Sequence, residues 1–120
     1  NTGPFIQYAY VRIQSIIKKY NNEISVDSRY SLNDKEKEVL KIIYDLPVVI
    51  KNSYKELSPA LIANYLYYLV KCYNSLYQNF NILNSESKES TSVRLLISLK
   101  TRDVIKLCSE LLGIDLPNKM

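Results

Sequence analysis

The most constraining feature of this sequence is a long, almost uncharged segment in its second half, from Ala60 to about Phe80. Its only charged residue is Lys71. Ser58 and Pro59 stand directly before it, and this pair is a typical helix start, because serine caps free backbone N–H groups and proline has none to satisfy. A helix so poor in charge is expected to be buried on most of its circumference. We therefore expect it at the centre of a bundle of helices.

The scarcity of turn-forming residues extends this expectation to the whole chain. Only 2 glycines and 4 prolines occur among 120 residues, which is too few for the many turns of an all-β fold. The length and the hydrophobic content of 47% suit one compact domain with a substantial core. The sequence thus predicts a single all-α domain over residues 1–120, built as a four- to five-helix bundle.

Capping and breaking residues place two further helices before the central one. Asn33 and Glu36 match a capping box, in which each side chain accepts from the other residue's backbone. Pro47 should end this helix near residues 45–46 and open another through Tyr54.

The last helix is expected from about Ser92 to Leu112, with Gly113 as its left-handed cap. Polar segments at 21–31 and 84–90 should form loops. We predict one core-facing and one polar stripe on this helix. The core stripe is Val93, Ile97, Val104, Cys108 and Leu111, and the polar stripe is Ser98, Arg102, Lys106 and Ser109.

The opening segment is expected to form a helix with two different faces. Thr2 or Gly3 can cap it, and Pro4 fits its first turn. One stripe at helical spacing is suited to the core, and the neighbouring stripe is aromatic and basic, which suits RNA. The first stripe is Ile6, Tyr10, Ile13, Ile17 and Tyr20, and the second is Phe5, Tyr8, Arg12, Ser15 and Lys19.

The residue types for catalysis are missing from this chain. It has no histidine, no Gly-rich phosphate loop and no paired carboxylates in an apolar setting. Cys72 and Cys108 are far apart and have no second pair, so we expect neither zinc nor a disulfide framework, and a reducing cytoplasmic setting. No apolar run approaches the roughly 20 residues of a membrane span. The prediction is a non-catalytic domain without cofactor, metal or membrane contact.

Tyrosine is unusually frequent, with 11 copies beside 2 phenylalanines and no tryptophan. Tyr73 and Tyr77 stand four residues apart on the central helix and therefore share a face, where they can form two walls of a pocket for an unpaired base. A stack on one such ring contributes roughly 1–3 kcal/mol. For Tyr65, Tyr67 and Tyr68 we expect packing between helices instead. The simplest interpretation of Lys18, Lys19, Lys100, Arg102 and Lys106 is that they are solvated side chains.

The two ends of the chain resemble one known family. The run NTGPFIQYAYVR at residues 1–12 is similar to the N-T-x-P-aromatic-x-Q-Y-A-x-x-R segment that begins the anticodon-binding domain of arginyl-tRNA synthetases. Residues 111–120, LLGIDLPNKM, are similar to the Leu-Gly-Ile turn, proline and terminal methionine with which these enzymes end. The chain is accordingly identified as a C-terminal, DALR-type domain of class I, excised from a larger synthetase.

This resemblance implies that the domain recognises a tRNA anticodon loop while its parent joins arginine to tRNA with ATP and magnesium elsewhere. The implied guest of the base pocket is cytosine, the middle base of most arginine anticodons. The implied RNA-binding residues are Phe5, Tyr8, Arg12, Tyr73, Tyr77 and Met120, the last as a lid on the pocket. Phe5 stands where the family often has tyrosine, so this chain lacks a hydroxyl there. Tyr77 stands where the family has the larger ring of tryptophan.

The implied partners are an arginine tRNA and the catalytic domain of the same polypeptide, and we expect a monomeric, cytoplasmic protein. Two alternatives stay open. The chain can be the helical domain of a related class I synthetase, such as the cysteine enzyme. It can also be a helical protein-interaction module in which the tyrosines form a binding patch.

Overall fold

Five α-helices joined by loops make up the protein, as expected of an all-α bundle. The computed structural model describes the backbone of residues 2–118 and the side chains of residues 3–118, and no strand occurs within this range. Asn1, Lys119 and Met120 lie outside the described residues. The helices are α1 (Thr2–Lys19), α2 (Asp34–Tyr44), α3 (Leu46–Lys55), α4 (Pro59–Asn79) and α5 (Lys88–Leu112).

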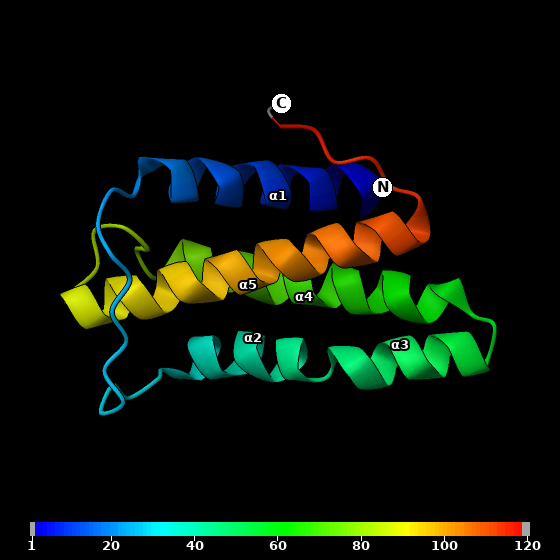
Figure 1. Ribbon diagram of the computed structural model, residues 1–120, viewed down its shortest axis with the longest axis horizontal. Coiled ribbons are helices and arrows are strands. Elements are labelled where there is room, and N and C mark those ends of the chain that lie inside the picture. The colour runs from blue at the N-terminus through cyan, green and yellow to red at the C-terminus, as the bar shows by residue number, and fades with distance from the viewer. Residues whose placement is uncertain (1, 119–120) are drawn as a thin grey trace.

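The helices are stacked as four columns, because α2 and α3 follow each other almost end to end (Figure 1). α1 and α4 run in one direction, and the α2–α3 column and α5 run in the opposite one. α4 contacts all four other helices, which confirms its central position. The shared core is drawn mainly from α1, α2, α4 and α5, and its fully buried members include Ile13, Val39, Leu66 and Ile105.

Local signals placed most helix ends. The capping box is present, since Asn33 accepts from the Glu36 backbone and Glu36 accepts from the Asn33 backbone. Pro47 lies in the first turn of α3, two residues after the break at Asp45. Ser58 precedes α4 as predicted, but its side chain makes no capping bond. Its backbone instead bonds to Ser53, whose hydroxyl donates to the Ser58 carbonyl at 2.7 Å.

Two predicted helix starts were wrong. α1 begins at Thr2, so Thr2 and Gly3 are helical rather than caps, and Pro4 lies at the third position of the helix, within its first turn. α5 begins at Lys88 rather than near Ser92, because Ser87 and Ser90 form a second capping box that the Ser-rich composition concealed.

α5 is more deeply buried than predicted. It packs against α1, α2 and α4, so Ser98 and Ser109, which were expected on a polar face, are fully buried. The Ser98 hydroxyl bonds to the Arg94 carbonyl at 2.8 Å, which makes its burial tolerable. Leu111 is 52% exposed rather than in the core. α4 is less buried than predicted: Tyr67 and Tyr68, which were expected to pack between helices, form part of an exposed face.

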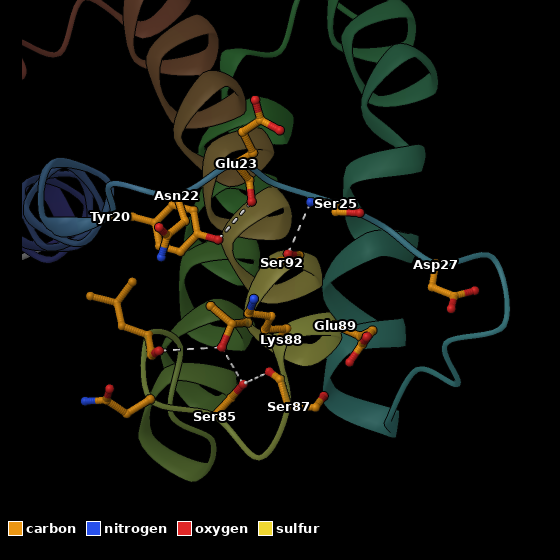
Figure 2. Close-up of a pocket in the computed structure, with 13 residues that line it drawn as sticks. Tyr20, Asn22, Glu23, Ser25, Asp27, Ser85, Ser87, Lys88, Glu89 and Ser92 are labelled. Atoms are coloured by element: carbon orange, nitrogen blue, oxygen red, sulfur yellow. Dashed lines mark hydrogen bonds between the residues drawn. The ribbon is translucent and has the colours of Figure 1, made fainter.

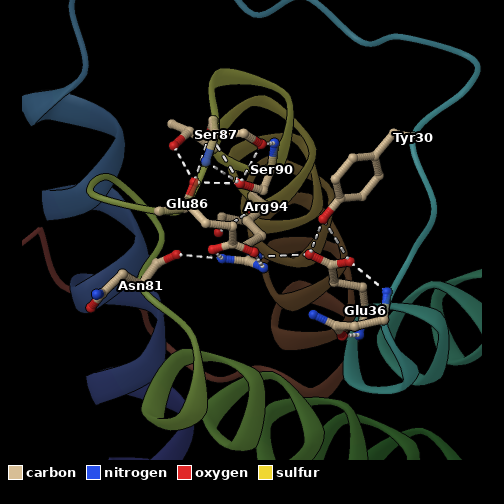
Figure 3. Close-up of polar contacts among 11 residues, drawn as sticks. Tyr30, Glu36, Asn81, Glu86, Ser87, Ser90 and Arg94 are labelled. Atoms are coloured by element: carbon tan, nitrogen blue, oxygen red, sulfur yellow. Dashed lines mark hydrogen bonds and ion pairs between the residues drawn. The ribbon is translucent and has the colours of Figure 1, made fainter.

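A buried ion network joins α5 to two loops (Figure 3). Arg94 is only 1% exposed. Its Nε donates to the fully buried Glu36 at 2.7 Å, and its two Nη atoms donate to both carboxylate oxygens of Glu86. Nη1 also donates to the Asn81 carbonyl at 3.0 Å, and the Tyr30 hydroxyl donates to Glu36. The network therefore holds the loops before α2 and before α5 against the same end of the bundle.

Gly113 ends α5 with a φ of +73°, in the left-handed region. A Cβ at this position would meet no atom within 4 Å, so replacement by alanine costs backbone energy alone. We expect Gly113→Ala to lower the free energy of unfolding by about 1 kcal/mol, as measured by urea denaturation. Gly113→Asn should lose less, because asparagine tolerates this conformation, and equal losses for both variants would contradict the conformational explanation.

Candidate nucleic-acid interface

The aromatic and basic side chains of α1 lie against one edge of α4. The rings of Phe5 and Tyr67 are 5.2 Å apart between centroids, at a tilt of 38°. One contact further along, Arg12 Nη1 donates to the Asn74 side-chain oxygen at 2.9 Å. Both pairs join residues 62 positions apart, as two parallel helices in constant register require. The two contacts are therefore about 10 Å apart along the helices.

Arg12 also covers an aromatic ring. Its guanidinium carbon lies 4.5 Å from the centroid of the Tyr77 ring, which is a cation–π contact. Tyr77 is partly exposed, and Tyr8, on the outer side of α1, is 59% exposed. We call these neighbouring side chains the α1–α4 surface. Its members are Phe5, Tyr8, Arg12, Tyr67, Asn74 and Tyr77.

The charged residues of α1 and α4 are all positive. α1 and α4 contain four basic residues and no aspartate or glutamate. Lys18, Lys19 and Lys71 are exposed, whereas Arg12 is held in place by its contacts. Rings beside cations, without nearby carboxylates on the same helices, suit a polyanion with unpaired bases.

Tyr73 does not belong to this surface. Its side chain is 0% exposed, and its hydroxyl bonds to Ser98 at 2.6 Å inside the core. Burial raises the pKa of this phenol to about 12, so it stays neutral. No ring face is open to a base, and the expectation that Tyr73 and Tyr77 form two walls of one pocket was wrong. Sharing a helix face at a spacing of four residues did not make the two rings equally accessible.

The predicted lid, Met120, lies outside the described residues, but the segment that leads to it is in place. After α5 the chain turns back over α1 (Figure 1). Gln7 Nε2 donates to the Asp115 carbonyl at 2.8 Å, and Leu116 packs against the main core. The C-terminal segment is therefore attached to the same helix that carries Tyr8 and Arg12.

Two residues of the α1–α4 surface were missed by the sequence analysis. Tyr67 was expected in helix packing, yet it is 41% exposed beside Phe5. Asn74 was not considered. One signal was available: Tyr67 and Asn74 are seven residues apart, and so are Phe5 and Arg12, the residues that they contact. Tyr65, by contrast, packs between helices as predicted and donates its hydroxyl hydrogen to the Ile42 carbonyl at 2.7 Å.

An open hollow lies elsewhere, at the end of the bundle where α5 begins (Figure 2). It has a volume of about 1000 Å³ and is lined by polar residues of both loops. Its hydroxyl groups bond to one another, as Ser85 does to Thr91 at 2.6 Å. Its lining includes Glu23, Asp27 and Glu89 beside a single lysine and a single ring, Tyr20, so it lacks the positive charge and the several rings of the α1–α4 surface.

The described residues offer neither a reactive thiol nor a group of metal ligands. Burial raises the pKa of the Cys72 and Cys108 thiols to about 11, so both remain protonated at neutral pH. No cluster of potential metal ligands occurs within residues 3–118. Over the same part of the chain, no helix is both long and apolar enough to cross a membrane.

Comparison with known proteins gives consistent matches. A family model described as the DALR anticodon binding domain matches residues 6–120. The arginine–tRNA ligase of Flavobacterium psychrophilum is 51% identical over 120 residues, which are all of this chain and 20% of that protein. The arginine–tRNA ligase of Parabacteroides distasonis is 38% identical over 125 residues, covering all of this chain and 21% of that protein. The chain thus spans about a fifth of the length of these relatives.

A solved structure has the same fold. The arginyl-tRNA synthetase of Thermus thermophilus superimposes with a TM-score of 0.88 over 98% of this chain and 21% of its own, at 24% sequence identity.

Proposed function

Because this chain belongs to the family of DALR anticodon-binding domains, we propose that it binds the anticodon loop of an arginine tRNA as the C-terminal domain of an arginine–tRNA ligase. The observation that carries this proposal is the α1–α4 surface, where exposed rings and one oriented arginine lie on two helices without acidic residues. The identities to two arginine–tRNA ligases support the choice of arginine over the cysteine enzyme.

The exposed rings provide the means of holding a loop whose bases are unstacked. Tyr8 and Tyr67 offer ring surface to bases, and Phe5 supports Tyr67 from the side. Arg12 and Tyr77 form a second contact point about 10 Å further along. Met120, which lies outside the described residues, remains a proposed RNA-binding residue on the family resemblance alone. The expected base at the centre is the cytosine of the anticodon's middle position.

The parent enzyme is proposed to join arginine to its tRNA with ATP and magnesium outside this domain. The described residues offer neither a cluster of metal ligands nor a Gly-rich loop for phosphates, so they do not fit ATP. The proposed partners of the domain are the tRNA and the catalytic part of the same polypeptide. We propose a monomeric enzyme of the cytoplasm.

Titration with a labelled anticodon stem-loop tests this function. The chain should bind an arginine stem-loop more tightly than the same loop with its middle base changed, because stacking and base-edge contacts both depend on that base. Each phosphate that a cation neutralises should add about 0.7 to the slope of log affinity against log salt. Equal affinity for both loops, or no binding at low salt, would overturn the proposal.

Matched tyrosine variants locate the binding surface. Tyr8→Ala should weaken binding by about 5- to 100-fold, as expected for the loss of one stacked base. Tyr44→Ala is the control, because Tyr44 is 84% exposed on α2, away from the α1–α4 surface. Equal effects of the two variants would place the RNA elsewhere.

A further inference from the structure

The contacts of Arg12 suggest how its charge is directed. One amino group of the guanidinium bonds to the Asn74 oxygen at 2.9 Å, and the guanidinium carbon lies 4.5 Å from the centre of the Tyr77 ring. A guanidinium has five N–H donors, and among the described residues Asn74 is its one hydrogen-bond partner. The remaining donors are therefore available to an outside acceptor.

We propose that Asn74 is a positioning residue: its side-chain oxygen holds Arg12 over Tyr77 in the orientation that contacts an acceptor of the anticodon loop. This inference rests on the proposed function. A long arginine side chain loses rotamer freedom when it binds a ligand, and a bond that orients it beforehand reduces this cost. Asn74 and Arg12 are supplied by the two helices of the same surface, so the orientation depends on the α1–α4 packing.

The amide suits this role better than a carboxylate would. A neutral oxygen orients the guanidinium but leaves its full positive charge for the RNA. An aspartate at position 74 would bind Arg12 more strongly and would also cancel its charge. The absence of acidic residues from α4 is consistent with this requirement. Asn74→Asp should therefore keep Arg12 in its orientation but remove its net charge, which separates these two contributions to binding.

The first test compares Asn74→Ala in two backgrounds by stem-loop titration. In the otherwise unchanged chain it should weaken binding by about 2- to 10-fold, which is the expected effect of ordering one long side chain. In an Arg12→Ala background it should have no further effect, because there is nothing left to position. Asn64→Ala is the control, since Asn64 is an exposed asparagine on the same helix and should leave affinity unchanged.

The second test uses Asn74→Asp. Thermal unfolding should be unchanged or shifted upward, whereas affinity for the stem-loop should fall and the salt slope should decrease by about 0.7–0.9, the value of one phosphate contact. Asn74→Asp in an Arg12→Ala background measures the direct repulsion between the new carboxylate and the RNA, and a decrease in slope as large there as in the otherwise unchanged chain would overturn the positioning role.

The outcomes distinguish this inference from the function on which it rests. An unsubstituted chain that binds neither stem-loop overturns the proposed function. If it binds, equal losses from Asn74→Ala in both backgrounds would show that Asn74 acts independently of Arg12, and no loss in either would show that Arg12 needs no positioning. Both results overturn the positioning role and leave the RNA-binding function in place.

Discussion

Replacement of Arg94 by methionine is expected to lower the free energy of unfolding by about 3–5 kcal/mol. Glu36 is fully buried and would be left without its charged partner, and Glu86 would lose two hydrogen bonds. Methionine retains much of the aliphatic stem, so the loss reports mainly on the ion network. Urea denaturation followed by circular dichroism measures it.

An exposed ion pair provides the control for this prediction. Arg29 pairs with Asp27 at 3.1 Å, but its side chain is 89% exposed. Arg29→Met should change the stability by less than about 0.5 kcal/mol. Adding Glu36→Gln to Arg94→Met should recover part of the loss, because it removes the stranded charge. Similar small losses for both arginines would mean that water reaches Arg94.

Replacement of Tyr73 by alanine is the second large effect, with an expected loss of about 3–5 kcal/mol. The ring is fully buried between α4 and α5, and alanine would leave a large cavity there. Tyr73→Phe should cost only about 1 kcal/mol, since it removes the bond to Ser98 while that hydroxyl keeps its bond to the Arg94 carbonyl. Thermal and urea unfolding of both variants provide the measurement.

The Tyr73 variants also decide between core and binding roles. Tyr73→Phe should bind the anticodon stem-loop like the unsubstituted chain, because its side chain does not reach the surface. Tyr68→Ala, a half-exposed tyrosine of the same helix, should leave stability nearly unchanged. A Tyr73→Ala variant that remains stable and loses RNA affinity would restore Tyr73 to the base pocket and contradict its burial.

The helices were largely predictable because their signals are local. The capping box at Asn33 and Glu36, the break at Pro47 and the left-handed Gly113 each depend on residues within one or two turns. The start of α5 was missed because serine serves equally in loops and in caps. The exposed state of Leu111 depends on how α5 packs against the other helices, which no local signal encodes.

The candidate site likewise has a part that was predictable from the sequence and a part that was not. The sequence placed Phe5, Tyr8 and Arg12 on one helix stripe, since helical spacing alone determines which residues of a helix share a face. It did not indicate which residues of α4 meet that stripe, because many registers of two helices bury similar apolar area.

By itself, then, the sequence determined an all-α bundle, most helix ends and the aromatic and basic stripe of α1, all of which follow from spacing and capping within single helices. Only the tertiary structure decided that Tyr73 is core, that Tyr67 joins Phe5, and that Asn74 holds Arg12. The reason is physical: a side chain's exposure and its partners depend on the register and crossing of helices far apart in the chain, and these are set by the packing of the whole core.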